Sequence, residues 1–250
     1  MKKQIALCVL VSLPFIVTAK DTQKKDLETT PENIIQKKVE LPMDGLTVVE
    51  TKNGKTLFIS KNGRYTFEGK LRNVYTQKEI KSLKDAEDER YFKIQDLDLS
   101  DSDIAPIPFG NPDLPLQARI FIDPYCKTCS ALLDKLKELK KEIRVEILIT
   151  PVSDKKANKR GLALWCRYEA DTSTANQVLE DLANPPKEEP KTTPAPSKDC
   201  HGNRVLLNSM LTRVLATPGL PLFWRADGAT FAGIPKDIKK FLNDKRETKS

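Results

Sequence analysis

The chain is poor in aromatic residues and contains only one histidine. Aromatic side chains make up 6% of its 250 residues. Few of them lie among the lysines and arginines, which are interspersed with acidic residues. Although the formal net charge is +7, this distribution indicates a solvated surface, so we expect no nucleic-acid binding. We interpret the single histidine, His201, as a surface residue and not as a catalytic one.

Long apolar runs are absent after the N-terminal segment, so we expect a soluble mature protein. Near the start, two lysines precede an apolar run over residues 5–17, and Thr18 and Ala19 follow it. A basic start, a short apolar stretch and small residues predict a secretory signal peptide over residues 1–19. An uncleaved membrane anchor is the alternative. Cys8 lies inside this segment, and we expect it to be removed with the signal.

Four cysteines remain after this removal, and export would place them in an oxidising compartment where disulfides persist. They are Cys126, Cys129, Cys166 and Cys200. Four cysteines allow three pairings, and the first two stand out because only Lys127 and Thr128 separate them. The other two flank a predicted insertion, where a disulfide would close a loop of about 35 residues and contribute about 3–4 kcal/mol. A second catalytic pair is the alternative.

The Cys126–Cys129 pair lies between a predicted strand and a predicted helix. Residues 118–123 are an apolar run, residues 130–141 have the leucine spacing of an amphipathic helix, and residues 143–150 alternate as in a strand. A helix N-terminus favours negative charge, so we expect a lowered pKa for the Cys126 thiol. We therefore predict Cys126 as nucleophile and Cys129 as resolving thiol. A structural disulfide and half of a zinc site are the alternatives, but no second close cysteine pair completes a zinc site.

A small β module precedes this unit. Residues 20–40 are polar and predict a loose leader. Three strand-like runs follow at 46–51, 56–60 and 64–68, and an Asn-Gly pair precedes each of the last two. Asn-Gly between β-rich runs is a strong hairpin signal, because both turn residues need positive φ. The pattern predicts an antiparallel meander.

A connector is predicted next. Thr76 and Glu79 have the spacing of a capping box, which predicts a charged helix as far as about Arg90. This helix either joins two domains or packs on its own sheet. Residues 97–116 contain four prolines and predict an extended linker. The predicted divisions are an N-terminal domain at 20–75, a connector helix and linker at 76–116, and a C-terminal domain at 117–250.

The C-terminal domain is predicted to carry a helical insertion. The elements expected after the second strand are helices at 159–168 and 174–182, a proline-rich loop at 185–197, a helix at 204–215, strands at 220–225 and 230–232, and a last helix from Pro235. The X-Pro bond at Thr217-Pro218, just before a strand, is a candidate cis bond.

The chain resembles the dimeric periplasmic disulfide isomerases of the DsbC/DsbG type. The resemblance rests on the two Asn-Gly turns of the meander, the run Phe-Ile-Asp-Pro-Tyr-Cys-Lys-Thr-Cys at 121–129, and Thr217-Pro218 ahead of the last strands. It implies an α+β and α/β protein. A small antiparallel, cystatin-like dimerisation module would be joined by a connector helix to a thioredoxin-like domain with a helical insertion. It also implies a V-shaped homodimer in the periplasm.

The resemblance assigns roles to particular residues. It implies a cis-Pro218 loop beside Cys126, so that Thr217 and Pro218, with Lys127 and Thr128, contact the substrate. It implies that Cys166–Cys200 is a structural disulfide, and that the protein needs no metal and no cofactor beyond the redox-active Cys126–Cys129 disulfide. The implied partners are misfolded or misbonded exported proteins and a membrane reductant of the DsbD type. A net disulfide oxidase and a periplasmic chaperone with only structural disulfides are the competing hypotheses.

Overall fold

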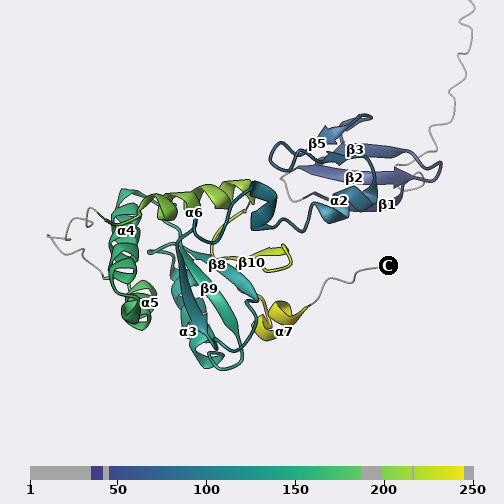
Figure 1. Cartoon of the computed structure of the whole chain (residues 1–250). Helices are drawn as coiled ribbons and strands as arrows, with labels where there is room; N and C mark the ends of the chain where they lie inside the picture. The colour runs from purple at the N-terminus through teal and green to yellow at the C-terminus, as the bar shows by residue number, and fades with distance from the viewer. Residues whose placement is uncertain (1–34, 42–44, 187–198, 216, 245–250) are drawn as a thin grey trace, which may run out of the picture.

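The structure is a computed structural model that describes residues 35–41, 45–186, 199–215 and 217–244. The predicted signal peptide and most of the predicted proline-rich loop lie outside these residues. The described chain forms an N-terminal sheet and a larger C-terminal domain that lie side by side (Figure 1). No helix of this described part is both long and apolar enough to cross a membrane.

The N-terminal sheet is the predicted antiparallel meander with one strand more. Its strands, in spatial order, are β1 (Ile35–Glu40), β2 (Leu46–Thr51), β3 (Thr56–Ser60) and β4 (Thr66–Phe67). The glycines of the two Asn-Gly turns have positive φ, as such turns require. The prediction of a loose leader is wrong for residues 35–40, because β1 pairs along β2 and buries Val39.

The predicted connector helix begins later than its capping box indicates. Glu79 and Ile80 form strand β6 (Glu79–Ile80), which pairs with β5 (Leu71–Arg72). Helix α2 (Leu83–Asp88) follows, and Ser82 is its N-cap. The buried side chains of α2 pack with those of β1, β2 and β3. The helix therefore packs on its own sheet, and that packing places Ile80 in a strand despite the local helix signal.

We expect Ser82→Ala to destabilise the N-terminal domain by about 1 kcal/mol, because the Ser82 hydroxyl accepts the N–H of Asp85 at 3.2 Å. Thr76→Ala is the matched control, since Thr76 stands at the cap that the sequence predicts. Urea unfolding followed by circular dichroism measures both free energies. A larger loss for Thr76→Ala would contradict the observed helix start.

A mixed five-stranded sheet organises the C-terminal domain. Its spatial order is β11 (Thr230–Ala232), β10 (Leu222–Arg225), β8 (Ala118–Ile122), β9 (Arg144–Ile149) and β7 (Pro106–Gly110). Strands β8 and β9 are parallel, and every other neighbouring pair is antiparallel.

Strand β7 corrects the predicted linker and the predicted domain boundary at residue 117. It lies at the edge of the sheet, and Ile107 and Phe109 are buried while Pro108 is exposed. Proline cannot donate to a ladder and is tolerated at an edge strand. The alternation of prolines with the apolar residues Ile107 and Phe109 therefore belongs to an edge strand and not to a linker.

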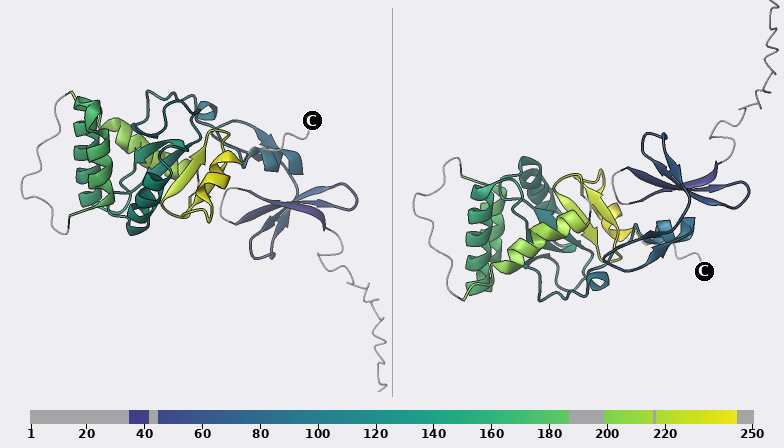
Figure 2. Two further views of the ribbon diagram at one scale, coloured as in Figure 1. Left: turned by 90° about the horizontal axis from the view of Figure 1, so that it is seen from below. Right: turned by 90° about the horizontal axis from the view of Figure 1, so that it is seen from above.

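Helices cover both faces of this sheet. The α-helices are α3 (Lys127–Glu138), α4 (Lys155–Ala170), α5 (Ala175–Ala183), α6 (Asn203–Val214) and α7 (Ile238–Asn243), and the 3-10 turns are η1 (Ile94–Leu97) and η2 (Thr172–Thr174). Ile120 and Ile122 of β8 face a core shared with α3 and α7, whereas Phe121 faces a second core shared with α6. Helices α4 and α5 stand at the end of the domain away from the N-terminal sheet (Figure 2).

The segment after α2 holds the N-terminal sheet against the C-terminal domain. The N–H of Phe92 donates to the carbonyl of Gly228 at 3.1 Å, and the indole N–H of Trp224 donates to the carbonyl of Phe92. Gly228 has φ +97°, and a Cβ there would lie 2.7 Å from the backbone of residues 91 and 92. The chain can approach this closely only because residue 228 is a glycine.

Candidate active site

The two neighbouring cysteines occupy the junction between β8 and α3. Cys126 is the N-cap of α3, and its Sγ accepts the N–H of Cys129 at 3.1 Å. The N–H of Cys126 in turn donates to the carbonyl of Asp123 at 3.1 Å, which closes the turn after the strand. The sequence folds this way because β8, which is apolar except for Arg119, is fully buried, and Pro124 follows two residues after its end, ahead of the amphipathic helix.

The structure joins Cys126 and Cys129 in a disulfide with a Cα–Cα distance of 5.1 Å. The two cysteines differ in exposure: Cys126 is half-buried, whereas Cys129 is only 1% exposed and belongs to the core beneath α3. Lys127 and Thr128, between them, are exposed. A reagent from solution can therefore reach Cys126 but not Cys129.

The predicted cis bond at Thr217-Pro218 is wrong, because the cis peptide bond of the described chain is Leu220–Pro221. The carbonyl oxygen of Leu220 lies 3.7 Å from the Sγ of Cys126, and the buried Pro221 stands directly before β10. Pro218 is exposed, and the Thr217 hydroxyl donates to the carbonyl of Gly219 at 2.7 Å. Because β10 pairs with β8, the proline next to β10 is the one placed beside the cysteine pair.

Asp123 is a site residue that the sequence reasoning missed. Its side chain is 3% exposed, and one carboxylate oxygen accepts the N–H of Tyr125 at 2.8 Å. The other oxygen accepts the N–H groups of Val152 at 2.8 Å and Ser153 at 3.0 Å. The carboxylate thus ties the cysteine turn to the loop that begins α4. An acidic residue directly after the apolar run at 120–122 was the available signal.

Arg160 of α4 packs against the same turn. Its guanidinium carbon lies 5.8 Å from the centre of the Tyr125 ring, and Arg160 is itself buried. Its Nη2 also donates to the carbonyl of Asp181 in α5. The insertion is therefore in direct contact with the residue that precedes Cys126.

Cys166 and Cys200 form a second disulfide, with a Cα–Cα distance of 5.4 Å. It links α4 to the segment that leads into α6. The neighbouring His201 is largely exposed. Its backbone N–H donates to one carboxylate oxygen of Glu169 at 2.7 Å, and its ring Nδ1 lies 2.9 Å from the other oxygen. In the described parts of the chain, no three His, Cys, Asp or Glu side chains are grouped so that they could hold a metal ion.

We expect the double variant Cys166→Ala/Cys200→Ala to lose about 2–4 kcal/mol of stability and to keep its thiol chemistry. The disulfide is remote in the chain from the Cys126 turn and limits the freedom of the unfolded insertion. Denaturant unfolding and a thiol-exchange assay on the same samples test both halves. Loss of exchange in a variant that is still folded would show that this pair takes part in the chemistry.

The arrangement is that of a thioredoxin-like domain. Parallel strands β8 and β9 are joined by α3, the cysteine pair begins that helix, and antiparallel β10 enters after a cis-proline. The helices α4, α5 and α6 are inserted between β9 and β10. The predicted thioredoxin-like domain with a helical insertion is thus present.

Neither a protein-family model nor a curated protein matches this sequence. Among solved structures, the catalytic domain of ScsC from Proteus mirabilis is similar at 18% identity and a TM-score of 0.47, over 57% of this chain and 89% of its own. The thiol-disulfide exchange protein α-DsbA2 from Wolbachia pipientis is similar at 16% identity and a TM-score of 0.44, over 56% of this chain and 85% of its own. DsbG from Helicobacter pylori is similar at 16% identity and a TM-score of 0.37, over 77% of this chain and 93% of its own. At these identities the likeness concerns the fold, so the function is argued from the site itself.

Proposed function

We propose that this protein is a thiol–disulfide oxidoreductase that acts on exported proteins as a disulfide isomerase or reductase of the DsbC/DsbG type. The observation that carries the proposal is the unequal exposure of one disulfide: Cys126 is half-buried at the start of α3, and Cys129 is buried behind it. A structural disulfide has no need of one more accessible cysteine at a helix N-terminus.

The reaction follows from this geometry. In the reduced protein the Cys126 thiolate is stabilised by the N–H of Cys129 and by the dipole of α3. It attacks a sulfur of the client disulfide, forms a mixed disulfide and releases the other client sulfur as a thiolate. The Cys129 thiolate then attacks Cys126 Sγ, which releases the second client sulfur and leaves Cys126–Cys129 oxidised. If a client thiolate attacks the mixed disulfide instead, the client disulfide is rearranged and the protein stays reduced.

The proposal is tested by insulin reduction and by refolding of scrambled ribonuclease with the purified mature protein. A protein with no activity in either assay contradicts it. A glutathione titration then separates an isomerase or reductase from a net oxidase, since strong oxidants have potentials near roughly −120 mV and isomerases lie closer to about −200 mV. Lys127 and Thr128, which lie between the cysteines, are the first residues to replace when the cause of the measured reduction potential is sought.

We propose a periplasmic location, with misfolded or misbonded exported proteins as clients and a membrane reductant of the DsbD type as electron donor. A basic, apolar and small-residue start over residues 1–19 supports export. Thiol trapping in cells tests this point: the isomerase predicts a mostly reduced Cys126–Cys129 pair, which becomes oxidised when the membrane reductant is deleted.

We also propose that the N-terminal sheet forms a homodimer. Strand β4 lies at the edge of that sheet, and Tyr65 and Phe67 on and beside it are exposed. An exposed edge with aromatic side chains favours pairing with a second chain. Sedimentation velocity of the mature protein, with Phe67→Lys as the disrupting variant, tests this proposal, and a monomeric wild type contradicts it.

A holding activity for unfolded clients is a second candidate function, and one cavity favours it. A cavity of about 280 Å³ lies between the N-terminal sheet and the end of α6. Its apolar lining includes Leu71, Val74 and Tyr75 from the N-terminal part and Val214 from α6. If holding is independent of the redox pair, aggregation of a reduced client is suppressed equally well when both motif cysteines are replaced.

A further inference from the structure

One surface beside the cysteine pair is apolar and exposed. Val152 in the loop after β9 is 51% exposed, and Leu206 and Met210 on α6 are 48% and 60% exposed. Leu206 and Met210 are four residues apart and therefore lie on one side of the helix. Together these three residues form what is called here the docking face.

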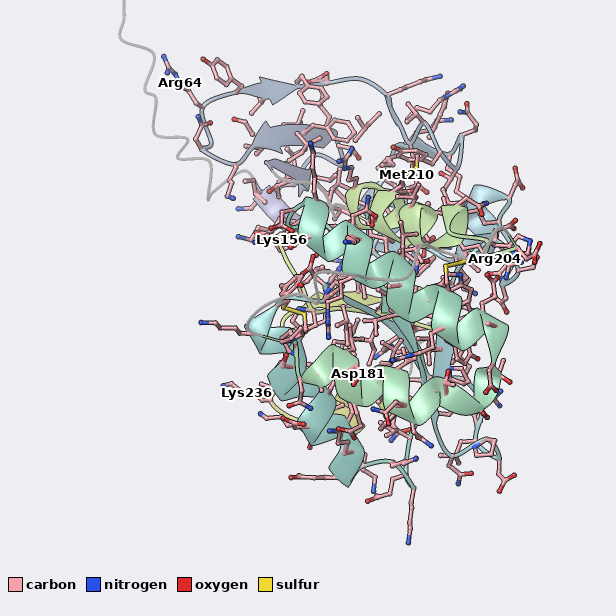
Figure 3. The ribbon with its side chains drawn as sticks, turned by 90° about the vertical axis from the view of Figure 1, so that its left-hand side faces the viewer. Arg64, Lys156, Asp181, Arg204, Met210 and Lys236 are labelled. Carbon is pink, nitrogen blue, oxygen red and sulfur yellow. A yellow bond between two sulfur atoms is a disulfide. The ribbon has the colours of Figure 1, made fainter. Side chains whose placement is uncertain are left out.

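Hydrogen bonds place the docking face next to Cys126. The Asp123 carboxylate that accepts the N–H of Tyr125 also accepts that of Val152, so Val152 adjoins the cysteine turn. On the other side of the same loop, the Ser209 hydroxyl donates to the carbonyl of Pro151 at 3.1 Å. This bond brings the part of α6 that carries Leu206 and Met210 to the loop. Figure 3 labels Met210 on α6 and Lys156 on the first turn of α4.

Exposed cations lie on the elements that adjoin the docking face. Lys155, Lys156 and Lys159 on the first turns of α4 are exposed, and so are Arg213 on α6 and Lys127 in the cysteine turn. Arg213 lies three residues beyond Met210 and so extends the same side of α6. In the described chain none of the five makes an ion pair, although ion pairs occur elsewhere on the surface.

Acidic groups close to these cations are already engaged. The Asp154 carboxylate accepts the N–H of Ala157 as the N-cap of α4, and Asp123 is buried. Lysines at the N-terminus of a helix oppose its dipole, so the three lysines of α4 do not stabilise that helix. The positive charges of these lysines can therefore attract an acidic partner.

We propose that the docking face binds an acidic segment of the client protein that also carries an apolar side chain, next to the cysteine under attack. The apolar side chain would cover Val152 and Met210, and the client carboxylates would pair with the lysines of α4. This inference rests on the proposed function and adds to it a class of substrate. Clients with acidic residues around a cysteine would react faster than clients with basic ones.

The test uses the reduced mature protein and two synthetic peptides. Each peptide has one leucine and one cysteine held as a mixed disulfide with thionitrobenzoate, and the two differ only in flanking glutamates or flanking lysines. Attack of Cys126 on the peptide sulfur releases thionitrobenzoate, and attack of Cys129 then releases the peptide thiol and leaves the protein oxidised. Stopped-flow absorbance of thionitrobenzoate gives the rate constants.

We expect the acidic peptide to react at least about tenfold faster at low ionic strength, and we expect this ratio to approach one in about 1 M salt, where the Debye length is about 3 Å. The double variant Lys156→Glu/Lys159→Glu should lose the preference. Its matched control is Lys135→Glu/Lys141→Glu, which changes the net charge equally in the C-terminal half of α3 and in the turn after it, and which should keep the preference.

Equal rates for the two peptides in the wild type overturn the inference, as does a control variant that loses the preference to the same extent. Equal rates combined with sedimentation on phosphatidylglycerol vesicles would assign the cations to a membrane surface instead. A protein that reacts with dithionitrobenzoate but with neither peptide also overturns the docking inference alone. A reduced protein that reacts with none of the three reagents overturns the proposed function.

Discussion

Cys126→Ala is expected to abolish insulin reduction and ribonuclease refolding, with a loss of at least about a hundredfold in rate. Cys129 cannot replace Cys126 as the nucleophile, because Cys129 is only 1% exposed and lies in the core beneath α3. The helix terminus would remain in place, since the turn is held through the backbone and through Asp123.

Cys129→Ala is the informative partner to this variant. It keeps the accessible nucleophile but lacks the resolving thiol, so the client should remain attached through a mixed disulfide to Cys126. Non-reducing electrophoresis with a disulfide-containing client detects this adduct. Activity retained in Cys126→Ala, or an adduct that forms in Cys126→Ala and not in Cys129→Ala, would reverse the two roles.

Asp123→Ala is expected to lower the free energy of unfolding of the C-terminal domain by about 2–4 kcal/mol, because three backbone N–H groups lose a charged acceptor that is itself buried. Those groups belong to Tyr125, Val152 and Ser153. Where the variant still folds, we expect the reactivity of Cys126 to fall as well, since the turn that positions it loses its tie to the α4 loop.

Asp154→Ala is the matched control for this prediction. Asp154 lies in the same loop and also accepts a backbone N–H, that of Ala157 at 2.8 Å, but it is exposed. Loss of that cap should cost about 1 kcal/mol. Guanidinium unfolding of both variants, together with the alkylation rate of Cys126 in each reduced protein, measures the difference. Similar free energies for the two variants would show that Asp123 has no special role.

Local sequence was sufficient where neighbours along the chain decide the structure. The two Asn-Gly turns predicted β2 and β3, because their glycines must take positive φ. The strand, cysteine pair and helix at 118–141 were also predicted in the right order, because their signals lie within this one stretch of sequence. Hydrophobic period and the break at Pro124 are local properties.

Local signals misled where distant segments compete for the same residues. Thr76 and Glu79 have the spacing of a helix cap, yet Ile80 is buried against the N-terminal sheet and Glu79 pairs with Arg72 in a hairpin. Pro106 and Pro108 indicate a linker by composition, yet the edge of a sheet accepts them because no partner needs their missing N–H.

By itself, the sequence determined that this protein has one Cys-x-x-Cys pair at a strand–helix junction, because that unit is specified by residues within one short stretch. Only the tertiary structure decided what surrounds the pair. Pairing of β10 with β8 brings Leu220-Pro221, and not Thr217-Pro218, to Cys126. Asp123 acquires its role only when the loop after β9 folds back onto it. These neighbours come from segments about 30 to 95 residues away in the chain, and contacts at such separations are set by packing and not by local propensity.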